Sequence, residues 1–304
     1  MFYRLKKYIN TNYYNFIAKK ILHTPPLKTS AGKKILIVSM VSHDDLLPYL
    51  VSIKSFYHFL DEKTEISVLN DGSLTEEDIN IINKHISPKE IVNIRNIDTG
   101  KCPRGGTWER LVYIIEKSVN YYVIQLDSDI VTIGNLMEIK EFIRLNKSYT
   151  LKGDIGSPGI ENLMEASERS QKSVSIHIQT IIEKNLCLYP DYRNLLYVRG
   201  CSAFAGFGKG LYTKDKLEMI SANMQNISGL DKWNEWGSEQ ITSNFVIANT
   251  KDSVVLPYNK YTNYYPYEQD NWDSKSLIHF IGTYRYKNGL YFKKTIDIIN
   301  LLSK

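Results

Sequence analysis

Short hydrophobic runs alternate with amphipathic segments over the first 146 residues. The runs at 34–41, 66–69, 91–94 and 121–126 have the length and composition of buried strands. Helices are predicted at 46–60 and from Trp108, where apolar residues recur every three or four positions, and from Thr75, where acidic residues fill the first turn. A further helix is predicted at 134–146. Strands that alternate with helices in this way predict an α/β fold with a Rossmann-like, mostly parallel mixed sheet flanked by helices.

Beyond residue 150 the pattern loosens into connections rich in glycine and polar residues. Strands are predicted there at 199–207, 253–256 and 277–281. A chain of 304 residues with 43% hydrophobic residues can bury a full core, as one large α/β unit or as two closely joined halves. We predict one domain, residues 35–304, preceded by an N-terminal extension, residues 1–34.

The net charge of +5 comes from this extension, which has eight Lys or Arg residues and no acidic residue. The remainder has 30 basic and 33 acidic residues, so it is slightly acidic, and nucleic-acid binding is not expected. The apolar residues of the extension follow i, i+4 spacing, which predicts a basic amphipathic helix: Leu5, Ile9, Tyr13, Ile17 and Ile21. Such a helix either lies on an anionic membrane surface through residues 1–24 or packs against the body, and the pattern favours neither.

No run of residues approaches the roughly 20 apolar positions of a membrane-spanning helix. The three cysteines, Cys102, Cys187 and Cys201, are odd in number and lack a Cys-x-x-Cys pair. This spacing argues against a disulfide framework or a zinc module. We therefore expect a reducing, cytoplasmic location, with peripheral attachment to the inner face of the plasma membrane if the extension binds lipid.

The motif with the clearest chemistry is Asp127-Ser128-Asp129, which follows the hydrophobic run at 121–126. In an extended segment residues i and i+2 point the same way, so the two carboxylates converge and repel each other unless a cation neutralises them. Carboxylate oxygens suit Mg²⁺ or Mn²⁺, which leave coordination positions for substrate phosphate. The motif therefore predicts a metal site that binds a diphosphate.

A second group of functional residues lies near the C-terminus, where the run 276–278 is followed by His279, Gly282 and Arg285. An imidazole could complete the coordination sphere of the metal. Glycine allows close approach of the backbone to a phosphate, and arginine pairs with its charge.

Together these motifs resemble glycosyltransferase family 8, the retaining sugar transferases that include glycogenin and bacterial lipopolysaccharide galactosyl- and glucosyltransferases. Four matches occur in the family's order over residues 35–290: Val68 to Gly72, Arg110-Leu111 with the Asp-x-Asp motif, Glu239-Gln240 with Asn244, and the His-x-x-Gly-x-x-Lys motif at His279. In the last of these, Arg285 replaces the family's lysine, and Tyr286-Lys287 replaces its usual Pro-Trp.

This resemblance implies a GT-A fold, a UDP-sugar donor and retention of anomeric configuration. It implies that residues 35–150 bind the nucleotide sugar and that residues 151–304 bind the acceptor, a glycan or lipid-linked molecule of lipopolysaccharide or surface polysaccharide synthesis. Asp127, Asp129 and His279 would hold Mn²⁺ or Mg²⁺. The implied donor-binding residues are Asn70, Asp71, Arg110, Asp127, Gly282 and Arg285, and the implied catalytic residues are Asp129, Glu239 and Gln240.

The sequence also allows three other possibilities. An inverting enzyme would use Glu235 or Glu239 as a base on the acceptor hydroxyl. A haloacid dehalogenase-like phosphatase would use Asp127 as its nucleophile, and a non-catalytic carbohydrate-binding protein could keep the same fold.

The aromatic-rich segment 258–272 is either a platform for a sugar acceptor or part of the core. Its aromatic rings have polar edges, a combination that suits stacking on a sugar. The six residues concerned are Tyr258, Tyr261, Tyr264, Tyr265, Tyr267 and Trp272.

Overall fold

The computed structural model describes residues 2–29 and 34–304, with side chains from residue 8 onward. By their internal contacts, these residues form two compact units built from separate stretches of chain. Unit 1 consists of Met1–Asn93, Leu126–Lys140 and Asn259–Lys304, and unit 2 consists of Ile94–Gln125 and Glu141–Tyr258. The sequence predicts that residues 35–150 bind the nucleotide sugar and residues 151–304 bind the acceptor. The two units are defined by contacts and not by ligands, so this assignment stays a prediction.

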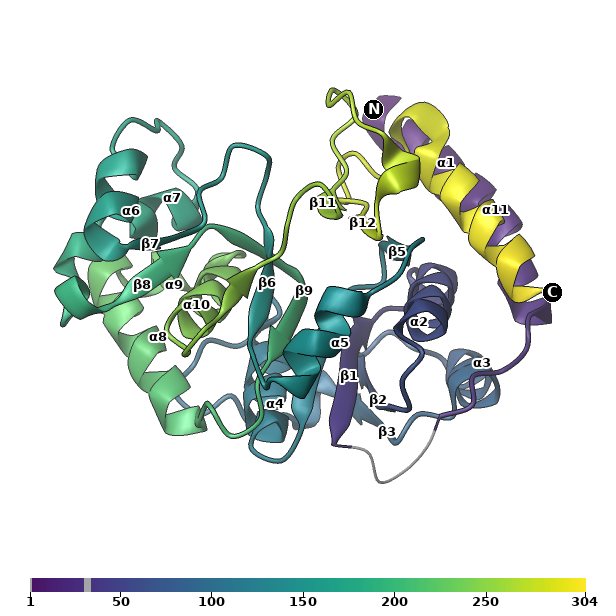
Figure 1. Ribbon diagram of the computed structural model, residues 1–304, viewed down its shortest axis with the longest axis horizontal. Helices are drawn as coiled ribbons and strands as arrows, with labels where there is room; N and C mark the ends of the chain where they lie inside the picture. Colours follow the sequence, from purple (N-terminus) through teal and green to yellow (C-terminus); the bar gives the residue numbers. More distant parts are fainter. Residues whose placement is uncertain (1, 30–33) are drawn as a thin grey trace. The chain divides into compact units, whose positions relative to one another are not determined.

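Unit 1 contains three parallel strands, β1 (Ile35–Val41), β2 (Glu65–Asn70) and β3 (Glu90–Asn93), in the order β1-β2-β3 (Figure 1). Helix α2 (Leu46–Leu60) connects β1 to β2, and α3 (Glu76–Ile86) connects β2 to β3. All five predicted elements are confirmed. Because the strands are parallel, their carboxyl ends lie at one edge of the sheet, and Val41, Asn70 and Asn93 are register partners there.

The turn between β2 and α3 is held by side chains that the sequence places at the right spacing. Asn70 accepts a hydrogen bond from the amide of Gly72 at 2.8 Å, and Gly72 has a φ of 101°, a conformation that favours glycine. Thr75 and Asp78 then form a capping box that starts α3.

A second, three-stranded sheet of unit 1 has the order β11 (Tyr261–Asn263), β12 (Leu277–His279) and β5 (Ile130–Thr132). Strand β12 is parallel to β11 and antiparallel to β5. The predicted strand 277–281 is therefore confirmed in a shorter form. Strands β5 and β11, each three residues long, were not predicted.

The first and last helices of the chain pack together in unit 1, where α1 (Phe2–Ala18) lies beside α11 (Leu290–Leu302) (Figure 1). Tyr14 of α1 is buried, and its ring stacks on Tyr291 at a centroid distance of 4.4 Å. The hydroxyl of Thr295 donates a hydrogen bond to the Tyr14 oxygen at 3.1 Å. One face of the predicted N-terminal helix thus packs against the body, which was one of the two alternatives that the sequence left open.

Unit 2 has four neighbouring strands in the order β10 (Val254–Val255), β6 (Tyr149–Lys152), β9 (Gly200–Phe207) and β4 (Tyr122–Leu126). Strand β10 is parallel to β6, and β6 is antiparallel to β9. Helices α4 (Trp108–Ser118) and α10 (Ser238–Ala248) pack against β9. The predicted strands at 121–126, 199–207 and 253–256 and the helix from Trp108 are confirmed.

The remaining elements are short or connect the others. The predicted helix 134–146 is shorter in the structure, as α5 (Met137–Arg144). The others are β7 (Ile160–Asn162), β8 (Leu196–Val198), α6 (Leu163–Ser170), α7 (Ile178–Lys184), α8 (Lys214–Ser228), α9 (Leu230–Trp233), and the 3₁₀ turns η1 (Lys19–His23), η2 (Ile94–Asn96), η3 (Leu186–Leu188), η4 (Tyr192–Asn194), η5 (Trp272–Ser274) and η6 (Lys287–Gly289).

The predicted fold class is confirmed: the protein is a mixed α/β structure with a mostly parallel sheet flanked by helices. Among the described residues, no helix combines the length and the apolar character that crossing a bilayer requires.

Candidate active site

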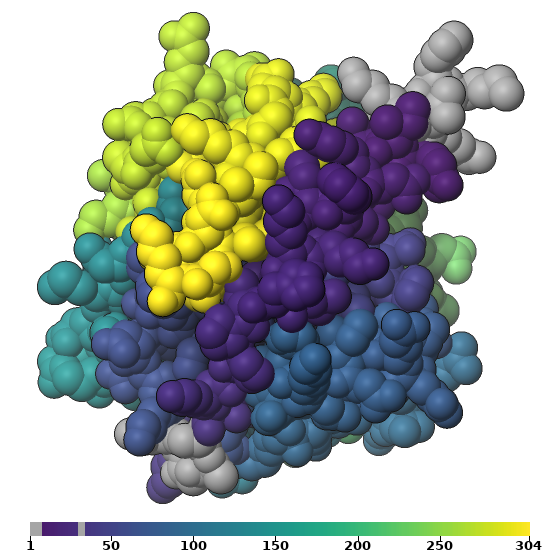
Figure 2. Space-filling model, turned by 90° about the vertical axis from the view of Figure 1, so that its right-hand side faces the viewer, coloured from purple at the N-terminus to yellow at the C-terminus, as the bar shows by residue number. Residues whose placement is uncertain are grey.

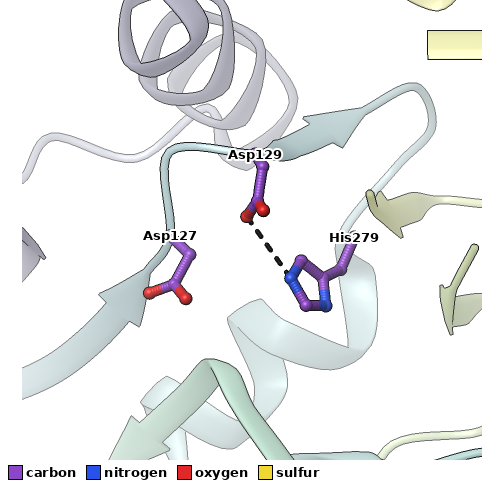
Figure 3. A group of neighbouring side chains, drawn as sticks. All are labelled: Asp127, Asp129 and His279. Atoms are coloured by element: carbon purple, nitrogen blue, oxygen red, sulfur yellow. Dashed lines mark ion pairs between the residues drawn. The ribbon is translucent and has the colours of Figure 1, made fainter. Parts of the chain in front are cut away.

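Asp127, Asp129 and His279 form a cluster in unit 1, as the two motifs predicted (Figure 3). Each side chain offers one ligand atom, and these atoms all lie within 4.8 Å of one another. Asp127 and Asp129 lie in the loop between β4 and β5, and His279 is the last residue of β12. Asp127 is half-buried, and the other two side chains are buried.

The pairing of β5 with β12 brings the histidine to the acidic motif. In the antiparallel register His279 is opposite Ile130, the residue that follows Asp129. The amide of Phe280 also donates a hydrogen bond to the Asp129 carbonyl at 2.9 Å. Residues about 150 positions apart in the sequence are thus joined by backbone pairing, which is independent of any ligand.

Asp129 has two charged or ionisable partners in the structure, Arg285 and His279. The distance from its Oδ2 to Nη2 of Arg285 is 2.6 Å, and that from its Oδ1 to Nε2 of His279 is 3.3 Å. Burial acts to raise the pKa of Asp129, but the charge of Arg285 and the contact with His279 outweigh it and hold this pKa well below its usual range. The carboxylate is therefore ionised at neutral pH.

Arg285 connects Asp129 to a third carboxylate. Its Nη1 lies 3.1 Å from Oδ1 of Asp45, which lies in the loop after β1. Burial works against the charge of Arg285, but Asp129 and Asp45 raise its pKa well above the ordinary value. Asp45 is thus the acidic residue after β1 that contacts Arg285.

The donor set fits a divalent metal ion. Two carboxylates and an imidazole are oxygen and nitrogen ligands that Mn²⁺ and Mg²⁺ accept, and imidazole suits Mn²⁺ better. Both carboxylates come from one short loop, two residues apart, and their ligand atoms lie within 4.8 Å of each other. The cluster therefore suggests a divalent metal site.

The other predicted donor-binding residues of unit 1 have different surroundings. The Asn70 side chain accepts hydrogen bonds from the turn that follows it, and Asp71 accepts them from the amide and hydroxyl of Ser73 at 2.9 and 2.6 Å. Gly282 is exposed, and a side chain added there would meet no atom of the described chain within 4 Å. A side chain would have room at position 282, so the glycine there is not required by close packing.

In unit 2 the predicted residues Arg110 and Glu239 form a buried pair. The Glu239 Oε2 lies 2.9 Å from the Thr107 hydroxyl, and 3.5 Å from both Nη2 of Arg110 and the Ser202 hydroxyl. Its other oxygen, Oε1, has no hydrogen-bond partner among the described residues, which costs about 1–3 kcal/mol for a buried acceptor. Burial raises the pKa of Glu239, against the lowering effect of Arg110.

Two neighbours of Glu239 on α10 have different roles. The Gln240 side chain is half-buried, and its Oε1 accepts a hydrogen bond from the Ser202 amide at 3.2 Å. Asn244 is fully buried, and it donates to the Gly200 carbonyl at 3.0 Å and accepts from the Thr150 hydroxyl at 3.1 Å. Asn244 therefore joins α10 to strands β6 and β9.

Two residues that were not predicted contact the predicted ones. Asn263 lies 2.6 Å from His279, and Thr107 bonds to Glu239. A glycine pair at 105–106 precedes Thr107 and marks an unusual turn, whereas no local signal marks Asn263. In the aromatic-rich segment, Tyr258, Tyr261 and Tyr264 are buried in the core, so they do not form an acceptor platform.

No family model matches the sequence, and no curated protein matches it. Solved structures share its fold at low sequence identity. The bifunctional glycosyltransferase WbbM is 12% identical with a TM-score of 0.53, over 90% of this chain and 51% of that one. The galactosyltransferase LgtC, in complex with donor and acceptor sugar analogues, is 9% identical with a TM-score of 0.50, over 88% of this chain and 96% of that one.

A third structure, the glycosyltransferase GlyE of Streptococcus pneumoniae TIGR4, is 10% identical with a TM-score of 0.53, over 89% of this chain and 63% of that one. The chain thus spans about half of WbbM and under two thirds of GlyE, but nearly all of LgtC. At these identities the likeness concerns the fold alone. The fold of this protein is the GT-A glycosyltransferase fold.

Proposed function

We propose that this protein is a metal-dependent glycosyltransferase that moves a sugar from a nucleotide donor to a glycan or lipid-linked acceptor. The observation that carries the proposal is the convergence of Asp127, Asp129 and His279 at strand ends of a GT-A fold. Two carboxylates and an imidazole at a strand end suit a metal-bound diphosphate.

In this proposal Asp127, Asp129 and His279 hold Mn²⁺ or Mg²⁺. The ion, when bound, stabilises the negative charge that develops on the departing nucleoside diphosphate. Arg285 contributes a fixed positive charge beside Asp129, and Asp45 orients its guanidinium. Gly282 leaves the exposed backbone beside Arg285 open to a phosphate.

We propose UDP as the nucleotide, on the resemblance to glycosyltransferase family 8, with Asn70 and Asp71 contacting the nucleoside. Arg110 contributes charge to the same donor. Asp129, Glu239 and Gln240 are the proposed catalytic residues, with Gln240 beside the reacting sugar carbon and Glu239 accepting from sugar hydroxyls. In LgtC, which shares the fold, an active-site mutant replaces a glutamine by glutamate, which supports a role for a glutamine in such a site.

Binding of the donor tests the proposal. Calorimetry with UDP-, GDP- and CMP-sugars, with and without Mn²⁺, should find one UDP-sugar that binds only with the metal. Asp129→Asn and Asp127→Asn should abolish this binding, whereas Asp61→Asn, an exposed carboxylate in a conformation that asparagine tolerates, should leave it intact. No binding of any nucleotide sugar would refute the proposal and favour the phosphatase or the non-catalytic protein.

Retention is the proposed stereochemical course. NMR of the first product formed would show an α-linkage from an α-linked donor. A β-linkage would instead assign the base of an inverting reaction to Glu235 or Glu239. Glu235 is exposed and pairs with Lys232 at 2.7 Å, so Glu235→Gln separates the two candidates without disturbing the core.

We further propose that the protein works at the cytoplasmic face of the plasma membrane, on a lipopolysaccharide or surface polysaccharide acceptor, and that α1 attaches it there. The outer face of α1 carries large apolar side chains that are 57–75% exposed: Tyr8, Ile9, Tyr13 and Phe16. Lys19 and Lys20 are exposed at the end of the helix. Figure 2 shows α1 (purple) beside α11 (yellow), along one face of unit 1. Aromatic and lysine side chains together suit an anionic lipid interface.

Liposome flotation tests this attachment. Deleting the helix would uncover the buried Tyr291, so substitutions on its outer face are the better variants. Lys19→Glu with Lys20→Glu should weaken binding to phosphatidylserine vesicles by about 1 kcal/mol per lysine or more, and Phe16→Ser should weaken it further. Met219→Ser, an exposed apolar residue of unit 2, is the control. Binding that is unchanged by all three helix substitutions would reject the membrane role.

A further inference from the structure

One tryptophan of unit 2 is largely exposed to solvent. Trp236 lies in the loop between α9 and α10 and is 71% exposed, whereas Trp108 and Trp233 are buried. A large aromatic surface is costly to leave in water, and an exposed tryptophan often marks a binding surface. The Trp236 and His177 rings form a T-shaped pair, with centroids 6.1 Å apart at an interplanar angle of 75°.

The loop beside Trp236 has an unusual backbone. A Cβ added to Gly106 would lie 3.8 Å from the Trp236 Cα, so the two loops run next to each other. Gly105, Gly106 and Thr107 have successive φ values of 85°, 53° and 76°. A positive φ is a genuine outlier for the β-branched Thr107, and such strain concentrates at functional sites.

Thr107 connects this loop to a buried carboxylate. Its hydroxyl donates a hydrogen bond to Oε2 of Glu239. Arg110 and the Ser202 hydroxyl also donate to this oxygen. The other oxygen, Oε1, has no donor among the described residues although Glu239 is only 2% exposed. A buried carboxylate oxygen without a donor is an acceptor that a ligand hydroxyl would satisfy.

We infer that Trp236, with the 105–107 loop and Glu239, forms the acceptor-sugar subsite of the proposed glycosyltransferase. A pyranose ring has an apolar C–H face, which stacks on an indole, and a rim of hydroxyls, which hydrogen-bond to groups beside it. The indole of Trp236 would supply the first, and the Glu239 and Thr107 oxygens at the neighbouring 105–107 loop would supply the second. The inference rests on the proposed function and names the class of its acceptor: a carbohydrate bound by one ring face.

Saturation-transfer NMR on the full-length protein tests the subsite directly. The probes are the methyl β-glycosides of glucose, galactose and N-acetylglucosamine, without nucleotide or metal. At least one should bind at millimolar concentration, with the strongest signals from protons of one ring face. Trp236→Ala should weaken this binding about tenfold, as truncation of a contact aromatic does, and Trp236→Phe should retain most of it.

Tyr267→Ala is the matched control, because Tyr267 is 70% exposed, lies in unit 1 and belongs to the aromatic segment that the sequence suggested. It should bind the glycosides as the unaltered protein does. Unchanged binding by Trp236→Ala, or no binding of any probe to the unaltered protein, would overturn the inference. Since the assay contains neither donor nor metal, its result is distinct from failure of the donor-binding test of the proposed function.

Discussion

The amide oxygen of Asn263 lies 2.6 Å from Nδ1 of His279, and both side chains are buried. An amide oxygen can only accept a hydrogen bond, so Nδ1 carries the proton. In neutral His279 the lone pair then belongs to Nε2, the atom that lies 3.3 Å from Asp129. The two residues are register partners in strands β11 and β12. Asn263 therefore selects the tautomer that a metal ligand requires.

Replacing Asn263 should weaken the metal site. Asn263→Ala removes the acceptor, and loss of such a supporting contact typically lowers metal affinity about 10- to 100-fold. Calorimetric titration with Mn²⁺ measures the effect. Asn263→Asp keeps an acceptor oxygen and should retain most of the affinity. The same affinity in Asn263→Ala and the unaltered protein would show that the contact has no part in metal binding.

Arg285 should compete with the metal for Asp129. In Arg285→Ala the buried carboxylate loses its charge partner, which should lower the free energy of unfolding of the metal-free protein by about 3–5 kcal/mol. Mn²⁺ should then raise the Tm of the variant more than that of the unaltered protein, because it restores the missing charge. Thermal unfolding with and without Mn²⁺ measures both effects, and an equal rise in the two proteins would contradict the prediction.

Arg285→Lys separates charge from geometry in the same assay. Lysine restores one positive charge but cannot contact Asp45 and Asp129 with two separate nitrogens of a planar group. Its stability without metal should lie between those of the alanine variant and the unaltered protein.

Acid should loosen the attachment of the N-terminal segment. In unit 1 the buried Lys54 donates hydrogen bonds to the Thr24 hydroxyl at 2.8 Å and the Pro25 carbonyl at 2.9 Å, and it lies 3.1 Å from His85 Nδ1. Burial and the neighbouring Lys54 lower the pKa of His85 to about 4. In the unfolded chain His85 takes up a proton near its ordinary pKa of about 6.5, whereas in the folded chain it stays neutral until about pH 4. The contribution of His85 to the free energy of unfolding is therefore complete above about pH 6.5 and is lost as the pH falls toward 4.

Urea denaturation at several pH values between 4 and 6.5 tests this contribution, which we expect to be on the order of 2 kcal/mol. His85→Asn keeps an acceptor for Lys54 and does not titrate, so its stability should change less over this range. His58→Asn, at an exposed position of α2, should behave as the unaltered protein does. A pH profile that His85→Asn leaves unaltered would reject the assignment.

Gly200 should be required by packing rather than by backbone conformation. A Cβ at this position would lie 2.6 Å from Oδ1 of Asn244 and 2.8 Å from the Leu151 carbonyl. Gly200→Ala should therefore lower the free energy of unfolding by about 1–3 kcal/mol. In Gly159→Ala the new Cβ meets no described atom within 4 Å, so this control should be neutral or slightly stabilising. Equal stability of the two variants in urea denaturation would contradict the packing argument.

The sequence by itself determined the parts of this protein that local pattern encodes. The hydrophobic runs became β1, β2, β3 and β4, of which β3 is only half-buried, and the amphipathic segments between them became α2, α3 and α4. The residue types of Asp127, Asp129 and His279 also indicated a metal site without any knowledge of their distance. Strand and helix periods are properties of neighbouring residues, and the ligand preferences of a metal are properties of single side chains.

Only the tertiary structure decided how these parts combine. The register of β5 with β12 brings His279 to Asp129, and that of β11 with β12 brings Asn263 to His279. Both registers depend on three-residue strands. Such strands are too short to show a local period, and their pairing partners lie far away in the chain. Which face of α1 is buried likewise depends on the residues that pack against the helix, and the same holds for the burial of Tyr261. Long-range pairing and burial are properties of the folded chain, so a local pattern does not specify them.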